Sequence, residues 1–444
     1  MGAAFFFFEY PPLAVKASIA APVDLLAFYC GGRVAAFGAD PYRAEPLRSC
    51  EDHAFTEATG KSPYPYLVVP APLPPYALTM LEPLGRLPFA TARATLLTML
   101  VAAALLIALA LCALARLYPV ARLYPIALCL VVFVGVLIPA LKLGQITPFV
   151  VAALAASAWA LRAGRVALGS LSAAFALVEP HIGLPACLAL FICLPRSRPW
   201  LALCAAELVL AALLCGGFER NVEYFTRVIP AHAMAEGTSF GGQYSLAALL
   251  AQIHVPESMA LTGGTISYLL MLVLGLVVAQ RVFKKSNDPA FAIATAPAFV
   301  LVGGTYIHIH HMAAALPLAA IVLGTSQRRL IPALILLGLL VPWDIIEKVG
   351  LANAWFHAIP PHDAHPALAA VADGGRLAED VWGAWVRSNA NGSRPAAELF
   401  LFKLPTWLSL LALCVTTFRA GFSTKMPLHN RASSANLAGA STIS

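Results

Sequence analysis

The chain has 444 residues, of which 60% are hydrophobic and only 11% are charged, and its mean hydropathy is +0.79. A water-soluble globular domain of this size carries far more charge, so the composition excludes that class. The net charge is +7, but the basic residues lie in short loops between apolar stretches, which argues against a nucleic-acid partner.

Apolar segments long enough to cross a bilayer recur along the chain and predict an all-α, polytopic transmembrane bundle of about 10–11 helices. Three further segments are short or interrupted by proline, which suits kinked or re-entrant segments lining a cavity: 69–82, 148–161, and 166–194 with a break at "VEPHIGLP". No cleavable signal peptide is expected. The clearest spans are 94–115, 124–141, 200–216, 265–281, 290–306, 312–325, 330–346 and 401–418.

These segments divide the chain into five regions. An N-terminal region with the first outer loop and juxtamembrane helices is followed by a transmembrane bundle, a polar loop, one last transmembrane helix and a tail rich in serine, alanine and asparagine. We expect the tail to be disordered. The boundaries are 1–93, 94–346, 347–400, 401–418 and 419–444.

Basic residues fall in every second connection between the predicted spans. The positive-inside rule makes these connections cytoplasmic. The alternate connections then face outward; they include the long ones at 1–68, 217–264 and 347–400, and they contain nearly all the histidine and carboxylate side chains. The basic residues are Arg116, Arg122, Arg162, Arg165, Arg196, Arg198, Arg281, Lys284, Lys285, Arg328, Arg329, Arg419, Lys425 and Arg431.

Most of the nine cysteines lie in apolar segments, where cysteine behaves as a small hydrophobic residue. Cys30 and Cys50 instead share the first outer loop and could form a disulfide in an oxidising compartment. Their spacing alone does not decide whether the bridge forms.

Asp24 lies between Pro22 and the apolar run "LLAFYCGG". One interpretation is a helix N-cap, with the carboxylate accepting hydrogen bonds from amides of the first turn. The other places a carboxylate at the mouth of a cavity near the membrane surface. The two interpretations are compatible.

Several polar residues lie at the outer ends of the predicted helices. "LKLGQITP" places Lys142 and Gln145 beside the start of a helix, where the lysine either reaches towards lipid headgroups or pairs with a phosphate. Glu179 and His181 flank the proline that breaks 166–194. Ionisable residues at membrane depth are costly, so these two are functional candidates.

"GTYIHIHHMAAALP" carries His308, His310 and His311 at the outer end of another helix. Residues 308 and 311 would share a helical face, which allows a metal pair, but the sequence identifies no further zinc ligands. A structural histidine cluster at the interface is the second alternative. Anion binding by imidazole N–H groups is the interpretation we favour, and no metal is expected.

In chain order, these motifs resemble glycosyltransferase family 87, membrane mannosyltransferases of the GT-C class that use a polyprenyl-phosphate sugar donor. The resemblance covers residues 22–325, and its most specific part is "LGQ" at a helix start followed by "RAGR…G…LS". The motifs are "FYCGGRVAAFGADPY", "YPYLVVPAPLPPYALTMLEPLGRLPFATA", "LGQITPFVVAALAASAWALRAGRVALGSLSAAFALVEPHIGLPACLALF", "GGQYSLAALLA" and "YIHIHHMAAALPLAAIVL".

The resemblance implies a role for each candidate residue. Asp24 matches an aspartate that activates the acceptor, and a histidine near "YIHIHHM" would contact the donor phosphate, with His308 or His311 favoured. The same match makes Gln145, Tyr42 and Tyr64 cavity-lining residues.

The chain departs from the family pattern in two places. Glu179-Pro180 stands where many members carry Lys-Pro, which inverts a charge near the donor. Members also begin with a full transmembrane helix, whereas residues 1–23 contain charged residues and prolines: Glu9, Pro11, Pro12 and Lys16.

The resemblance implies a hexosyltransferase in the inner (plasma) membrane with its site on the extracytoplasmic face. It would transfer a hexose, mannose being the first choice, with inversion, from a polyprenyl-phosphate donor to a lipid or glycan acceptor. No cofactor is expected, because imidazole, lysine or arginine contacts can stabilise a single leaving phosphate. A transporter or flippase of lipid-linked sugars is the alternative from another class, and a scaffold without chemistry is a third.

Overall fold

The protein is described from a computed structural model, which covers residues 21–60, 68–116, 128–129, 132–238, 243–326, 329–341, 375–390 and 396–422. Within these ranges the chain forms helices and no β-strand, with two isolated bridges that pair Arg43 with Leu377 and Gln243 with His308. The all-α class is therefore confirmed. The expectations for residues 1–20, for Tyr64 and for most of the 347–400 loop lie outside the described residues.

Four long helical stretches in the described part have the length and apolar composition needed to cross a membrane. They are α6 (Phe89–Leu114), the stretch Pro195–Glu236 that contains α12 (Arg198–Glu223), α15 (Glu257–Ser286), and Lys403–Phe422 in α22 (Ala396–Phe422). Large apolar side chains on them stay exposed, including Leu214 at 76% and Phe218 at 73% on α12. Apolar surface on this scale suits contact with lipid, so the chain is a membrane protein.

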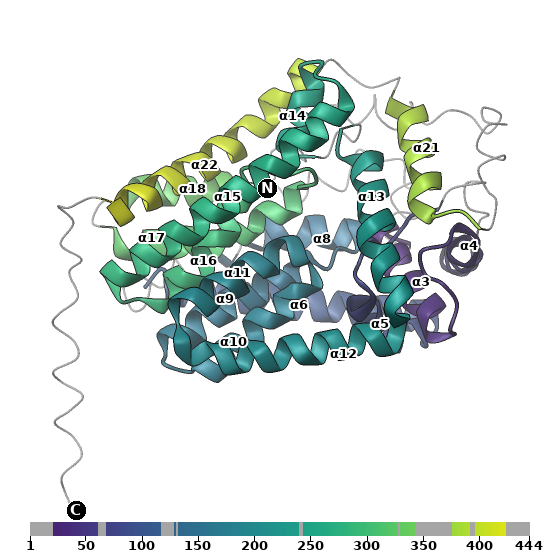
Figure 1. Cartoon of the computed structure of the whole chain (residues 1–444), viewed down its shortest axis with the longest axis horizontal. Helices are drawn as coiled ribbons and strands as arrows, with labels where there is room; N and C mark the ends of the chain where they lie inside the picture. The colour runs from purple at the N-terminus through teal and green to yellow at the C-terminus, as the bar shows by residue number, and fades with distance from the viewer. Residues whose placement is uncertain are drawn as a thin grey trace, which may run out of the picture.

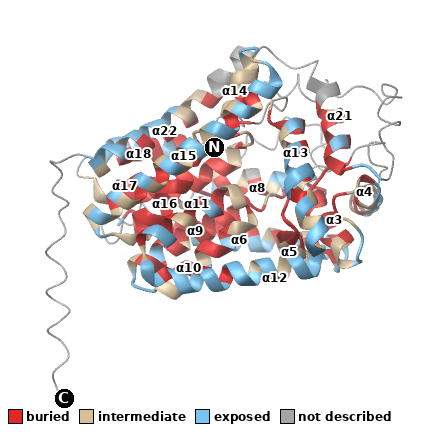
Figure 2. Ribbon diagram, viewed as in Figure 1, coloured by how far each residue is buried: buried red, intermediate tan, exposed pale blue. Residues whose placement is uncertain are grey.

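Shorter apolar helices fill the space beside α15 and form the bundle on the left of Figure 1. Every residue from 290 to 300 of α16 is buried, and Figure 2 shows buried residues concentrated in this part of the molecule. A helix that is apolar all round belongs in such an interior. The helices are α9 (Thr147–Arg162), α10 (Val166–Phe175), α11 (Pro180–Cys193), α16 (Pro289–Val300), α17 (Leu316–Thr325) and α18 (Leu330–Leu340).

A second group of helices lies on the right of Figure 1, with α8 (Ile138–Leu143) between the groups. The Cys30–Cys50 disulfide, which the sequence left open, is present and joins two helices of this group, α3 and α4. The helices are α3 (Val23–Ala36), α4 (Ala44–Thr59), α5 (Pro75–Gly85), α13 (Ile229–Glu236) and α21 (Ala378–Ala390).

The described helices bear out some predicted spans and correct others. The break in 166–194 is confirmed: α10 continues into a short 3₁₀ turn, and α11 starts at Pro180, a residue suited to a first helical turn. The span predicted for 290–306 is too long, because α16 ends at Val300 and the chain then turns through Gly304 at φ +101°. The segment 69–82 is helical only from Pro75 onwards.

The two ends of α9 have opposite character. At its C-terminal end, Arg162 donates to the Leu114 carbonyl at 2.8 Å and pairs with Asp288 at 2.7 Å. Another basic side chain, Lys285, donates to the carbonyl of Ala420 near the end of α22. The N-terminal end of α9, at Thr147, faces the acidic and histidine side chains described next. The basic connections and the candidate site therefore lie at opposite ends of the bundle.

Candidate functional site

A glycine turn brings Asp24 against Gln145, 121 residues further along the chain. The helix α8 ends at Gly144, whose φ is +77°, and a Cβ on that residue would lie 2.7 Å from the backbone nitrogen of Leu25. The missing side chain therefore lets α3 approach the turn directly. Gln145 follows, and its Nε2 donates to Asp24 Oδ2 at 2.5 Å.

Asp24 is not the N-cap of α3, so that interpretation of the sequence is wrong. Pro22 occupies the cap position, Asp24 is the second helical residue, and its carboxylate makes no capping hydrogen bond. Burial raises the pKa of Asp24 to about 7, although the hydrogen bond from Gln145 and the charge of His308 oppose this shift. The residue is thus a carboxyl group that changes its charge near neutral pH.

Two of the three clustered histidines hold one another in place. His308 caps the 3₁₀ helix η5 (Ile309–Ala315), and its side chain accepts the backbone N–H of His311. In return, His311 Nδ1 accepts the backbone N–H of His308 at 3.0 Å. His308 Nε2 lies 3.0 Å from Glu236 Oε2, while His311 Nε2 lies 3.9 Å from Glu179 Oε2. His308 is therefore held at both ring nitrogens, whereas His311 is held at Nδ1 and its Nε2 only faces Glu179.

His310 differs from its two neighbours. Its ring stacks on His308 with the centroids 5.0 Å apart, and it meets His311 edge-on at 4.4 Å. Within the described part of the chain, neither of its ring nitrogens has a hydrogen-bond partner. It is the histidine of this turn that has nitrogen atoms left for a ligand.

Tyr306 lies at the centre of the polar cluster. Its ring is 4.7 Å from His308 and 4.7 Å from His232 on α13, in edge-on geometry in both cases. Burial raises the pKa of the Tyr306 hydroxyl well above its usual value, and the charges of Glu236, Asp24 and Glu179 act in the same direction. One phenol is thus within electrostatic reach of all three carboxyl groups.

Glu179 and His181 join the cluster from the break between α10 and α11. Thr147 Oγ1 donates to Glu179 Oε1 at 2.5 Å, and the His181 ring lies 4.5 Å from that of His311. Within the described residues, His181 Nε2 is buried without a hydrogen-bond partner. Glu179, which stands where many family members carry a lysine, is therefore a buried carboxyl group beside two imidazoles.

Glu179, His181 and His311 form one group of three potential metal ligands, with their ligand atoms within 4.8 Å of one another. The tautomer of His311 does not suit a metal, however. Its Nδ1 accepts a backbone N–H, so the ring proton is on Nε2, the nitrogen that faces Glu179. A metal ligand needs a nitrogen without a proton. The hydrogen bond at His311 Nδ1 therefore argues against a metal centre formed by these three residues.

The structure gives two other predicted residues different surroundings from this cluster. Lys142 is exposed on the last turn of α8. Tyr42 is buried, and its hydroxyl donates to the Leu73 carbonyl at 2.7 Å. Tyr64 lies outside the described residues. The cluster brings together the remaining candidates, which are Asp24, Gln145, Glu179, His181, His308, His310 and His311.

Other members of the cluster carry no assigned role in the sequence analysis. Glu236 and Gln243 contact His308, while Trp382 reaches Glu236 from the distant helix α21. The spacing of His232 and Glu236, four residues apart on α13, was the available signal, since such residues share a helical face. Trp382 gives no comparable signal, because 146 residues separate it from Glu236.

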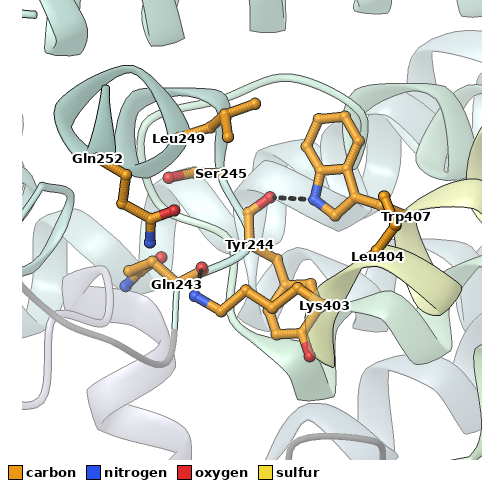
Figure 3. A pocket seen from close by; sticks show the side chains of 8 residues that line it. All are labelled: Gln243, Tyr244, Ser245, Leu249, Gln252, Lys403, Leu404 and Trp407. Atoms are coloured by element: carbon orange, nitrogen blue, oxygen red, sulfur yellow. Dashed lines mark hydrogen bonds between the residues drawn. The ribbon is translucent and has the colours of Figure 1, made fainter. Parts of the chain in front are cut away.

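A pocket behind Gln243 shows how the C-terminal helix supports the cluster (Figure 3). Lys403 Nζ donates to the Gln243 carbonyl at 2.6 Å, and Trp407 Nε1 donates to the Tyr244 carbonyl at 3.0 Å. Both bonds fix the backbone that carries the Gln243 side chain. The pocket is lined by Gln243, Tyr244, Ser245, Leu249, Gln252, Lys403, Leu404 and Trp407.

Comparison with known protein families gives one match. The family model described as "Glycosyltransferase family 87" matches residues 73–304, which is more than half of the chain. The matched range includes Gln145, Glu179, His181 and Glu236, whereas Asp24 lies well before it and the turn 308–311 lies just after it. No curated relative and no solved structure matches the chain.

Proposed function

The chain belongs to glycosyltransferase family 87, and on this premise we propose that it transfers a hexose from a polyprenyl-phosphate donor to an acceptor hydroxyl. The observation that carries the proposal is a half-buried carboxyl group, Asp24, aimed by Gln145 and within electrostatic reach of the histidine turn. Mannose is the first sugar to test. The fold is proposed to be of the GT-C type.

Asp24 would act as the general base. The acceptor oxygen attacks the anomeric carbon of the donor sugar, and the bond from that carbon to the phosphate oxygen breaks with its electron pair leaving on the phosphate. The acceptor proton passes to Asp24. A single displacement of this kind inverts the anomeric centre. A base whose pKa lies near 7 combines a large deprotonated fraction at neutral pH with useful basicity.

His310 would contact the leaving phosphate. The sequence favoured His308 or His311, but both ring nitrogens of His308 and Nδ1 of His311 already have partners within the protein. A phosphate placed among three carboxyl groups needs hydrogen-bond donors that gain strength as charge develops. His310 offers one such N–H donor, and the Tyr306 hydroxyl is adjacent to the same turn. Metal-ion assistance is not required in this scheme.

The plasma membrane and its extracytoplasmic side are the proposed location. Support comes from the opposite ends of α9: the Arg162–Asp288 pair and Lys285 lie at one end and the candidate site at the other. If basic connections stay in the cytoplasm, the site faces outward. The proposed acceptor is a lipid or a glycan presented on that side.

The test measures transfer of labelled mannose from synthetic polyprenyl phosphate mannose by membranes that contain wild type or Asp24→Asn at matched protein levels. We expect the asparagine variant to lose about 10²–10⁴-fold in rate, because it cannot take the proton. Equal rates would remove the base assignment. Transfer by neither protein, with binding and transmembrane movement of the lipid-linked sugar retained in both, would favour the flippase alternative.

A further inference from the structure

Glu236 is the point at which three segments of the chain meet. It is the last residue of α13, and only 6% of its surface is exposed. Its Oε1 accepts from Trp382 Nε1 of α21 at 2.5 Å, while its Oε2 accepts from His308 Nε2 at 3.0 Å and lies 3.4 Å from Gln243 Nε2. Three N–H groups from three segments thus converge on one carboxylate.

The partners of Glu236 are themselves fixed in orientation. The side-chain oxygen of Gln243 accepts the backbone N–H of Ile307 at 2.8 Å, so its NH₂ group must face Glu236 and His308. The His308 ring accepts the backbone N–H of His311, which leaves Nε2 to carry the proton towards Glu236. An ionised carboxylate accepts all these bonds, whereas an amide would place its own donors against some of them.

The helix α21 connects this carboxylate to the other half of the site. At its start, the backbone N–H of Ala378 donates to the Tyr42 carbonyl at 2.9 Å, and that of Ala44 donates to the Arg376 carbonyl at 2.9 Å. Residues 42–44 follow α3, the helix that carries Asp24. One turn into α21, Trp382 reaches Glu236. The helix therefore ties the segment after the Asp24 helix to the carboxylate that holds the histidine turn.

We propose that Glu236 is a positioning residue, which orients the 304–311 turn so that His310 faces the site. Because Trp382 also binds Glu236, this orientation depends on the packing of α21 against the rest of the protein. The inference rests on the proposed function for its catalytic consequence. The structural link between α21 and the turn stands independently of the sugar that is transferred.

The experiment compares purified full-length wild type with Glu236→Gln and Trp382→Phe in lipid nanodiscs. Hydrogen–deuterium exchange is followed in peptides covering residues 304–311 and 378–390, and donor KM and kcat are measured on the same samples. Glu379→Gln is the matched control, because Glu379 is a buried carboxyl group on α21 with no hydrogen-bond partner among the described residues.

We expect both variants to exchange faster in both peptides, and the control to show no faster exchange than wild type in either peptide. Glu236→Gln should lower kcat by about 10–100-fold, the loss typical of a hydrogen bond to a charged group. Donor KM should change little, because charge builds on the phosphate only in the transition state, whereas the polyprenyl chain contributes to ground-state binding. General loss of structure would instead affect peptides throughout the chain.

Wild-type exchange in the 304–311 peptide of Trp382→Phe would overturn the inference, as would wild-type kcat in Glu236→Gln. If Glu236→Gln does not yield folded protein, the Trp382→Phe result decides. If wild type transfers no sugar from a polyprenyl phosphate, the proposed function fails, but the exchange data still decide whether Glu236 couples α21 to the turn.

Discussion

The two halves of the candidate site are built in different ways. On the Asp24 side, a single hydrogen bond from Gln145 and one glycine turn hold the carboxyl group. On the histidine side, His308 and His311 cap one another, and Glu236 accepts a hydrogen bond from the outer nitrogen of His308. The first half keeps a group that can change its charge, and the second fixes a turn so that one ring, His310, remains available. The comparison predicts different responses to substitution.

The largest effect is expected from His310→Ala. This change removes a ring N–H that no described residue uses, so the fold should persist while transfer falls by about 10²–10³-fold, as for loss of one donor to a developing anion. Rates at saturating donor and thermal unfolding would be measured together, with His53→Ala on the exposed face of α4 as the control. If the variant has a lower Tm as well as lower activity, His310 is a structural residue like its neighbours.

Gly144→Ala should reduce transfer by about 100-fold. A Cβ at this position would collide with α3 at Leu25, and the residue has φ +77°, so the turn must shift and carry Gln145 away from Asp24. Displacement of a catalytic group by about 1 Å costs rate on this scale. Gly164→Ala provides the control for backbone strain, since it has φ +76° but nothing within 4 Å of its Cβ position. Equal losses in both variants would attribute the effect to strain alone.

The pH dependence of transfer should report on Asp24. Since the pKa of Asp24 is about 7 and the base must be deprotonated, kcat/KM should fall about tenfold for each pH unit below 7. The hydrogen bond from Gln145 lowers that pKa, so Gln145→Leu should move the acid limb to higher pH. If the acid limb stays at the same pH in this variant, Gln145 does not influence the ionisation of Asp24.

The smallest effect on transfer is expected from Glu379→Gln, because Glu379 lies outside both halves of the site. Burial raises the pKa of Glu379 from an ordinary 4.5 to about 8. The folded state therefore holds this proton where the unfolded state has lost it, and stability falls as pH rises from 4.5 to 8. Glutamine has no proton to lose in this range, so the Tm of the variant should exceed that of wild type at pH 9 and match it at pH 4. A higher Tm of the variant at pH 4 would attribute the stabilisation to packing instead.

The sequence predicted the site unevenly, for reasons that particular residues make clear. The sequence named Asp24, Gln145 and the histidines as candidates because polar and ionisable groups at membrane helix ends are rare, and the structure brings these candidates together. The sequence favoured His308 or His311 for the phosphate contact and could not see which ring nitrogens the backbone of the turn occupies, the observation on which the proposal of His310 depends. Glu236 was missed, because its partners Trp382 and His308 are 146 and 72 residues away.

The fold was predicted well where composition alone decides it. An apolar chain in lipid must satisfy its backbone within helices, so the all-α bundle, the long apolar spans and the break at Glu179 follow from the order of the residues. Helix ends were less certain, as at Val300, because a glycine turn ends α16 inside an apolar run.

The sequence by itself determined a helical membrane protein with its candidate site residues near the ends of its helices. Only the tertiary structure decided which of them meet. The close approach of α3 to Gly144 brings Gln145 to Asp24, and the packing of α21 brings Trp382 to Glu236. Contacts between segments more than a hundred residues apart depend on packing of the whole chain, and no local pattern of residues encodes them.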